Sequence, residues 1–367
     1  MTSSPSRRAG RIGTALAAAA VAVLALSACS GSSTPAASGS GSGTSADYGD
    51  ISVQYSWIKN EEFAGEYYAY DEGFYDEAGF GTVTGIAGPD TGVAKLLSGT
   101  VQFALSDAAS VGAAVAEQDA PLKIIGTTFQ KNPFTVLSLQ SGGNIKTPKD
   151  LIGKKIGVQD SNASVFAALL KANDIDASQV TIVPVDFDPT PLINGEVDGF
   201  MAYLTNEAIT VEMEGYPVTN LAYADNGLPY VAEAFATTDQ YLAEHRDLVK
   251  AFLTAEIKGW TKTFTEPLDD TVAKVVDHYN QSAAAGDLTF GDLDKAKVKA
   301  GLEAQAKLIS TEETEKNGLF TISDDLKAQT LASLKASGWT LDADKLFDTS
   351  IIDEIYAENP DLVKYQP

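Results

Sequence analysis

One short segment of the sequence concentrates side chains that could recognise a ligand. Residues 57–80, WIKNEEFAGEYYAYDEGFYDEAGF, contain eight aromatic residues, seven acids and one lysine. Aromatic faces stack on flat rings, and carboxylates accept hydrogen bonds from amino and ring N–H groups. The helical spacing of Phe63, Tyr67, Tyr70 and Phe74 also suits a packed core. We therefore expect this segment to serve both as core and as ligand wall, divided by position.

The elements that position these side chains follow from the local pattern. Residues 51–57 alternate in polarity like a strand. Asn60 can cap the following helix, whose first turn holds two glutamates, and Gly73 would stop that helix after about Asp71. Residues 57–63 are then the candidate ligand wall. Residues 67–80 are expected to be a packed helix with an acidic outer face, followed by a turn.

Further along, strands alternate with helices at the spacing of βαβ units, which indicates mostly parallel sheets. We expect strands at 82–86, 101–105, 122–128, 155–159, 180–183, 197–202 and 218–222, and extended crossing segments at 134–140 and 230–237. We expect helices at 91–98, 107–117, 161–171 and 191–195, then at 239–264, 268–281, 291–309 and 323–336.

This pattern predicts an α/β fold with two lobes, two crossover strands and a helical C-terminal part. We expect lobe 1 to comprise residues 47–133 and 232–367, and lobe 2 to comprise residues 134–231. Ligands of open α/β sheets bind outside the carboxyl ends of the strands. In such a clamshell, both sets of strand ends would face one cleft.

The N-terminal residues have the pattern of an export signal. Within residues 1–28, three arginines precede an apolar run at 12–26, which is shorter than the roughly 20 residues that cross a bilayer. LSAC at 26–29 resembles the bacterial lipobox, so we expect lipidation of Cys29; an ordinary secretory signal is the alternative. Residues 30–46 are a Gly/Ser-rich tether. The folded body would thus lie outside the cell membrane on a lipid anchor, exported by the general or the twin-arginine route.

Length, charge and cysteine content narrow the function classes. A chain of 367 residues is long enough for two domains. Its net charge of −24 argues against nucleic acid or an anionic membrane surface as a partner. Because Cys29 is the only cysteine, the chain cannot form an internal disulfide or a cysteine-based metal site in the folded part. A monomer is expected.

A series of short segments points to a known family. They are WIKN at 57–60, FAGEYYA at 63–69, EGFYDEAGF at 72–80, LSGTVQF at 97–103, KDLIGKKIG at 149–157, GEVDG at 195–199, TNE at 205–207 and DLVKAFL at 247–253. In this order, over about residues 50–355, they resemble ABC-transporter substrate-binding proteins of the branch that includes sulfonate, nitrate and thiamine-pyrimidine-precursor binders. The resemblance implies a type II periplasmic-binding-protein clamshell, with a small-molecule ligand, an ABC permease and its ATPase as partners.

The resemblance also implies a ligand site between the first strand–helix junction and the loops of the second lobe. The implied ligand-binding residues are Trp57, Asn60, Phe63, Asp107, Gln159, Ser161, Asn162, Tyr203, Asn206 and Glu207. Structural alternatives stay open for some of them. Trp57 could belong to the core, and Asn60 and Asp107 could serve only as helix caps.

The charges in this region favour one ligand class. Anion sites typically use bare helix N-termini and basic groups. Here the first helix opens with two glutamates, Asp107 and Glu207 add acidity, and only Lys59 offers local positive charge. We therefore expect a flat nitrogen-containing ring, such as an aminopyrimidine thiamine precursor or riboflavin. A sulfonate such as taurine, or nitrate, is the alternative within the same fold.

Two other function classes are less compatible with the sequence. A eukaryotic relative of this fold makes the thiamine pyrimidine with a cysteine-rich iron-binding segment and a histidine. This chain has no cysteine after Cys29, and His245 and His278 have charged neighbours. It also lacks a P-loop, a nucleophile elbow and an HExxH motif. We expect a binding protein without cofactor or metal rather than an enzyme; a sensor or scaffold lipoprotein is the remaining alternative.

Overall fold

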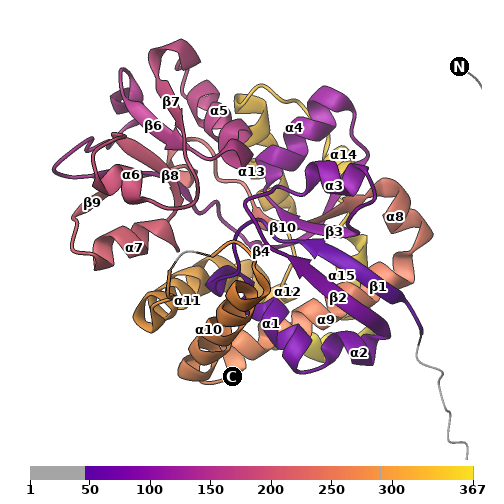
Figure 1. The fold of residues 1–367 in the computed structure, drawn as a ribbon. Coiled ribbons are helices and arrows are strands. Elements are labelled where there is room, and N and C mark those ends of the chain that lie inside the picture. Colours follow the sequence, from indigo (N-terminus) through magenta and orange to yellow (C-terminus); the bar gives the residue numbers. More distant parts are fainter. Residues whose placement is uncertain (1–45, 290, 367) are drawn as a thin grey trace, which may run out of the picture. The chain divides into compact units, whose positions relative to one another are not determined.

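The computed structural model describes residues 46–289 and 291–366 (Figure 1). The expectations for the leader, for Cys29 and for the tether up to residue 45 lie outside the described residues. None of the helices in the described part is long and apolar enough to cross a bilayer.

Within the described residues, the strands form two five-stranded sheets, ordered β2-β1-β3-β10-β4 and β7-β6-β8-β5-β9. The first sheet contains β1 (Gly49–Gln54), β2 (Phe80–Ile86), β3 (Phe103–Ser106), β4 (Leu122–Phe129) and β10 (Ala232–Thr238). The second contains β5 (Phe134–Leu139), β6 (Lys155–Val158), β7 (Thr181–Pro184), β8 (Gly199–Tyr203) and β9 (Val218–Ala222). We call residues 46–133 and 232–366 lobe 1, and residues 134–231 lobe 2.

Each sheet combines parallel strands with one antiparallel strand at a crossing of the chain. β1 pairs in parallel with β2 and β3, and β6 pairs in parallel with β7 and β8. The chain passes between the sheets after β4 and returns after β9, and the strands it enters, β5 and β10, are antiparallel to their neighbours. The predicted α/β class with two crossover strands is confirmed. Strands β3 and β4 are buried along nearly their whole length, as expected for a sheet covered on both faces.

Helices cover the sheets and make up the C-terminal part. They are α1 (Ala64–Asp71), α2 (Phe74–Ala78), α3 (Val93–Leu97), α4 (Ala108–Gln118), α5 (Ala163–Ala172), α6 (Thr190–Ile193), α7 (Glu207–Met213), α8 (Asp239–Glu244), α9 (Arg246–Thr265), α10 (Leu268–Ala285), α11 (Lys295–Ile309), α12 (Glu312–Asn317), α13 (Asp324–Ala336), α14 (Ala343–Leu346) and α15 (Ser350–Glu358). The predicted helix at 239–264 is two helices, because the backbone leaves helical geometry at His245. Five helices of the described residues, α2, α7, α12, α14 and α15, were not predicted.

The acidic and aromatic segment is partly as predicted. Asn60 caps the short 3-10 turn Glu61–Phe63, because its side chain accepts a hydrogen bond from the Glu62 N–H. Helix α1 ends at Asp71, and Gly73, two residues later, adopts the left-handed conformation. The predicted acidic outer face of residues 67–80 is confirmed, because Asp71, Glu72, Asp76 and Glu77 are exposed. The three acids before it, Glu61, Glu62 and Glu66, are buried. Helices α9 and α10 pack on α1 (Figure 1), and α11 packs on the 3-10 turn Glu61–Phe63.

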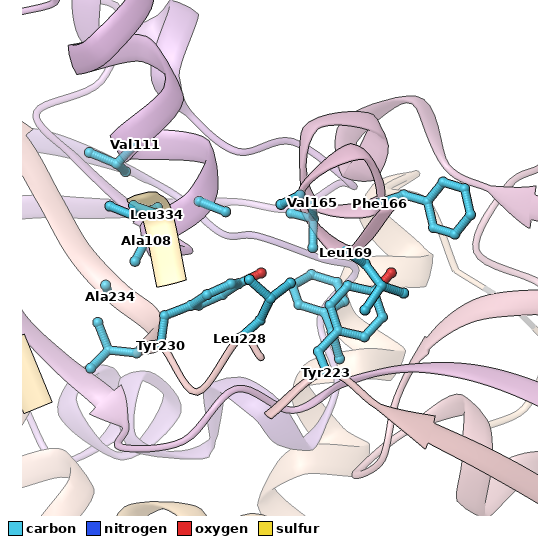
Figure 2. Close-up of a cluster of buried hydrophobic side chains, with 14 of the residues drawn as sticks. Ala108, Val111, Val165, Phe166, Leu169, Tyr223, Leu228, Tyr230, Ala234 and Leu334 are labelled. Atoms are coloured by element: carbon cyan, nitrogen blue, oxygen red, sulfur yellow. The ribbon is translucent and has the colours of Figure 1, made fainter. Parts of the chain in front are cut away.

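The two lobes share one hydrophobic core. Figure 2 shows α4 side chains Ala108 and Val111 of lobe 1 and α5 side chains Val165, Phe166 and Leu169 of lobe 2, with Tyr223, Leu228, Tyr230 and Ala234 of the return crossing and Leu334 of α13. α13 packs against both α4 and α5. This shared core joins the two lobes where the chain crosses between them.

Candidate functional site

A small cavity lies between residues that follow strand ends in both lobes. Ser56 and Trp57 follow β1, and Asp107 follows β3. From lobe 2, Tyr203 ends β8 and Ser161 follows β6. The inner cavity, as we call it, has a volume of about 30 Å³ and is lined by Ser56, Trp57, Glu62, Thr91, Ser106, Asp107, Phe134, Ser161, Asn162, Met201, Ala202, Tyr203 and Glu207. Its position is that of ligand sites in open α/β sheets.

Glu233 of β10 connects the two lobes beside this cavity. Its carboxylate accepts a hydrogen bond from the Tyr203 hydroxyl at 3.0 Å and from the Ser56 hydroxyl at 2.8 and 2.9 Å. Its backbone φ is +45°, a left-handed conformation that is strained for a residue with a Cβ. Burial raises the pKa of Glu233 to about 7, although the hydrogen bonds from Ser56 and Tyr203 lower it. Strain and shifted pKa values concentrate at functional sites.

The carboxyl groups of Glu62 in lobe 1 and Glu207 in lobe 2 line the inner cavity, as does that of Asp107. Glu207 accepts hydrogen bonds from the Tyr203 backbone N–H at 2.8 Å and from the Asn206 amide at 2.9 Å. Burial raises the pKa of Glu207 to about 7. Burial also raises the pKa of Glu62 well above its usual range, and the neighbouring Glu233 raises it further. Carboxyl groups that titrate near neutrality can donate as well as accept hydrogen bonds.

Three polar atoms at this cavity have no hydrogen-bond partner among the described residues. They are Glu62 Oε2, Ser106 Oγ and Ser161 Oγ, all of them buried. Buried polar groups are nearly always hydrogen-bonded, so each exception needs an explanation. Polar atoms of a ligand would supply these partners.

Asp107 keeps both of the roles considered for it. Its carboxylate caps α4, accepting from the N–H groups of Ala109 at 2.8 Å and Ser110 at 2.9 Å, and from the Ser110 hydroxyl at 2.6 Å. It also lines the inner cavity. Burial raises its pKa, and the hydrogen bonds from Ser110 and Ala109 lower it. These bonds leave Asp107 fewer free acceptor positions than the other carboxyl groups have.

A larger outer compartment of about 370 Å³ adjoins the inner cavity at Trp57 and Glu207. Lys297 of α11 lines it and is 8% exposed. Its ammonium group pairs with Glu61 at 2.6 Å and donates a hydrogen bond across the cleft to Asn206 Oδ1. The prediction that only Lys59 supplies positive charge here is therefore wrong. The Lys297 charge is already matched by Glu61.

The structure brings most of the predicted site residues to these two compartments. Trp57, Asp107, Ser161, Asn162, Tyr203 and Glu207 line the inner cavity, and Trp57, Asn60, Asn206 and Glu207 line the outer one. Gln159 is buried and holds Asn162 through a 3.0 Å hydrogen bond. The prediction that Phe63 lines the ligand site is corrected. Its ring is fully buried in the core and stacks on the Tyr55 ring, with 4.5 Å between the ring centroids.

Sequence reasoning missed Glu233 and Lys297. Glu233 had a local signal, since an acid interrupts the apolar run of β10. Lys297 had none, because it lies in a C-terminal helix and reaches the cleft only through the tertiary fold. Among the described residues, no group of three or more His, Cys, Asp or Glu side chains is arranged to hold a metal ion.

Comparison with known proteins places this geometry among solute-binding folds. The family model described as NMT1/THI5 like matches residues 60–269, more than half of the chain. The riboflavin-binding protein RibY of Chloroflexus aurantiacus is 26% identical over 255 residues, which are 65% of this chain and 69% of the relative.

Solved structures share the fold at low sequence identity. A protein from Bordetella bronchiseptica matches with a TM-score of 0.68 and 14% identity, over 85% of this chain and 98% of that one. The alkanesulfonate-binding protein SsuA from Xanthomonas axonopodis, bound to MOPS, matches with a TM-score of 0.60 and 14% identity, over 81% and 96%. These likenesses show the periplasmic-binding-protein fold that the sequence predicted.

Proposed function

Since the chain belongs to the NMT1/THI5-like family, we propose that it is the extracytoplasmic solute-binding lipoprotein of an ABC importer. It would take up a small ligand between its lobes and deliver it to a membrane permease driven by an ATPase. The similarity to RibY and the fold shared with SsuA support this role. Binding without chemical turnover is part of the proposal.

The ligand that suits the cleft best is a flat, nitrogen-containing heteroaromatic such as an aminopyrimidine thiamine precursor or riboflavin. One observation carries this proposal: the inner cavity combines the aromatic side chains of Trp57 and Tyr203 with an unpartnered oxygen of Glu62. Aromatic side chains can stack on such a ring. The carboxyl group can accept from ring N–H or amino groups, and can donate to ring nitrogens or carbonyls when protonated.

A sulfonate or nitrate is less compatible with these groups. An anion in the inner cavity would face Glu62 and Glu207 without a facing cation, because Lys297 is paired with Glu61. Glu207 also occupies the first turn of α7, where an anion could otherwise approach the helix N-terminus.

Ligand binding would require the lobes to move. The inner cavity of about 30 Å³ is of the size that holds a water molecule, not a ring. The hydrogen bonds Tyr203–Glu233 and Lys297–Asn206 span the lobes and would open to admit the ligand. A ligand that contacts both lobes then favours the closed form, which is the form expected to dock on the permease.

Titration of the purified protein with four compounds tests the proposed ligand class. Riboflavin, an aminopyrimidine thiamine precursor, taurine and nitrate are added while tryptophan fluorescence is followed. We expect saturable quenching by a heteroaromatic and none by the anions. The response should vanish in Trp57→Phe and persist in the matched variant Trp339→Phe, whose indole contacts Glu117 elsewhere in lobe 1. A response to taurine or nitrate alone would overturn the ligand assignment.

The membrane anchor is a separate part of the proposal and has its own test. Export and lipidation at Cys29 predict that the protein partitions into detergent after Triton X-114 phase separation. Cys29→Ser should move it to the aqueous phase. Equal partitioning of the two forms would show that no lipid is attached there.

A further inference from the structure

Lobe 1 contains a second pocket, distinct from the interlobe cleft. It has a volume of about 270 Å³ and lies between α1, α2, α10 and the edge strand β2. Four tyrosines contribute to its lining, Tyr55, Tyr67, Tyr70 and Tyr75. The other lining residues are Lys59, Glu66, Thr82, Val83, Thr84, Gly85, His278 and Gln281. It shares none of its lining with the inner cavity or the outer compartment.

Two polar groups of this pocket have no partner within the described part of the chain. Glu66 Oε2 and the Tyr67 hydroxyl are buried without a hydrogen bond, and each side chain is only 2% exposed. The other oxygen of Glu66 accepts from the Trp260 indole N–H at 3.3 Å. Both residues line the pocket. A ligand with hydrogen-bond donors would provide partners for the carboxyl oxygen and for the hydroxyl.

The charges around Glu66 leave room for a cation. Among the described residues, no ion pair reaches Glu66. The two basic side chains at the pocket face other acids: Lys59 pairs with Asp287 at 3.4 Å, and the His278 ring bonds Asp71 at 3.0 Å. Burial and the nearby Glu256 raise the pKa of Glu66 well above its usual range, as expected for a carboxyl group whose charge the protein itself does not neutralise.

We propose that this pocket binds a small organic ammonium ion that carries at least two N–H groups. One N–H donates to Glu66 Oε2 and another to the Tyr67 hydroxyl, and the cationic head lies against the tyrosine rings. The acidic surface of the chain, with a net charge of −24, favours cations over anions at this position. A metal ion is a poorer occupant, because no described group of three acidic, His or Cys ligands exists there.

Butylammonium and butan-1-ol test this site as a matched pair of similar shape, with and without charge. The purified protein is titrated by calorimetry, and the occupied site is identified from the three tryptophan indole N–H resonances in NMR spectra. Trp260 reports on this pocket and Trp57 on the cleft. We expect butylammonium to bind at least roughly tenfold more tightly than butan-1-ol, because a charge-assisted hydrogen bond is added, and to shift the Trp260 resonance.

Three variants complete the test. Glu66→Gln should weaken butylammonium binding roughly tenfold or more while leaving butan-1-ol nearly unchanged. Tyr70→Ala, which removes a 60% exposed ring and leaves the core intact, should weaken it several-fold. Trp57→Ala should have no effect. Equal affinity for amine and alcohol, a shift confined to Trp57, or indifference to both Glu66→Gln and Tyr70→Ala would overturn the proposal.

Discussion

The hydroxyl of Tyr203 in lobe 2 donates a 3.0 Å hydrogen bond to the Glu233 carboxylate in lobe 1, at the edge of the inner cavity. The same carboxylate is held by Ser56, so the acceptor is fixed before the lobes meet. This bond joins the part of lobe 2 that lines the cavity to the sheet of lobe 1. If the lobes open to admit a ligand, as proposed, this bond would break on opening and form again on closing.

Tyr203→Phe should loosen the closed form without unfolding either lobe. The variant loses one hydrogen bond to a carboxylate, while Ser56 continues to satisfy Glu233. We expect ligand affinity to fall roughly tenfold and the melting temperature to change little. Ligand titration and calorimetric melting measure the two effects, and Tyr216→Phe in lobe 2 is the control. An unchanged affinity would show that the bond does not contribute to closure.

Trp57→Ala and Phe63→Ala should have different effects, because Trp57 lines the cleft and Phe63 belongs to the core. Trp57 is partly exposed and lines the cleft, so its loss should weaken ligand binding at least roughly tenfold while the fold persists. Phe63 is fully buried and stacks on Tyr55, so its loss should lower the free energy of unfolding by about 3–5 kcal/mol. Denaturant unfolding and ligand titration of both variants check this. The assignment fails if Trp57→Ala is the variant that unfolds.

The buried pair of Lys297 and Glu61 gives a double-mutant prediction. Lys297→Met leaves Glu61 as an uncompensated buried charge, because its side chain is 0% exposed. We expect a loss of roughly 3–5 kcal/mol in the free energy of unfolding. Adding Glu61→Gln should recover most of this loss, since the buried charge is then removed. If the double variant is as unstable as the single one, the pair acts through packing and not through charge.

Stability should depend on pH through the buried carboxyl groups. The pKa of Glu207 lies near 7 in the folded protein, above its usual value of 4.5, because burial disfavours the charged form. The folded state therefore holds a proton that the unfolded state releases between about pH 4.5 and 7. The contribution of Glu207 to stability is full below pH 4.5 and is lost as pH rises to 7, by at most about 3 kcal/mol.

Glu207→Gln isolates this effect, because the amide keeps the shape of the side chain and does not titrate. Melting temperatures of both proteins should be compared from pH 5 to pH 8. We expect the variant to gain stability relative to the original protein as pH rises. A constant difference between the two proteins across this range would show that Glu207 does not titrate there.

The fold could be predicted from sequence because its signals are local. Alternating and apolar strands, helical spacing and the cap at Asn60 depend on neighbouring residues, and they appear as expected. The break at His245 lacked a Gly or Pro, so the two helices on either side were predicted as one. The burial of Glu61 depends on α11, whose Lys297 pairs with it and whose Gln305 donates to its carbonyl at 2.9 Å. A contact across more than 230 residues leaves no local pattern.

In the candidate site, too, positions set by local sequence were predicted, and positions set by contacts distant in sequence were not. Residues beside strand ends, such as Asp107 and Tyr203, lie where topology requires, at the cavity. Phe63 was misplaced because helical spacing alone does not tell which face of a short turn meets the core. Glu233 lies in a strand that the chain enters only after crossing twice between the lobes. Its contact with Tyr203 therefore depends on how the two lobes lie against each other.

A crystal structure of the protein with its tightest-binding heteroaromatic, grown without competing anions, would show whether such a ring binds between the lobes. We expect the ring between Trp57 and Tyr203, with polar ring atoms within hydrogen-bond distance of Glu62 or Glu207 and with contacts to both lobes. A ligand found outside this cleft, or a cleft that selects taurine or nitrate with Glu62 and Glu207 turned away, would contradict it.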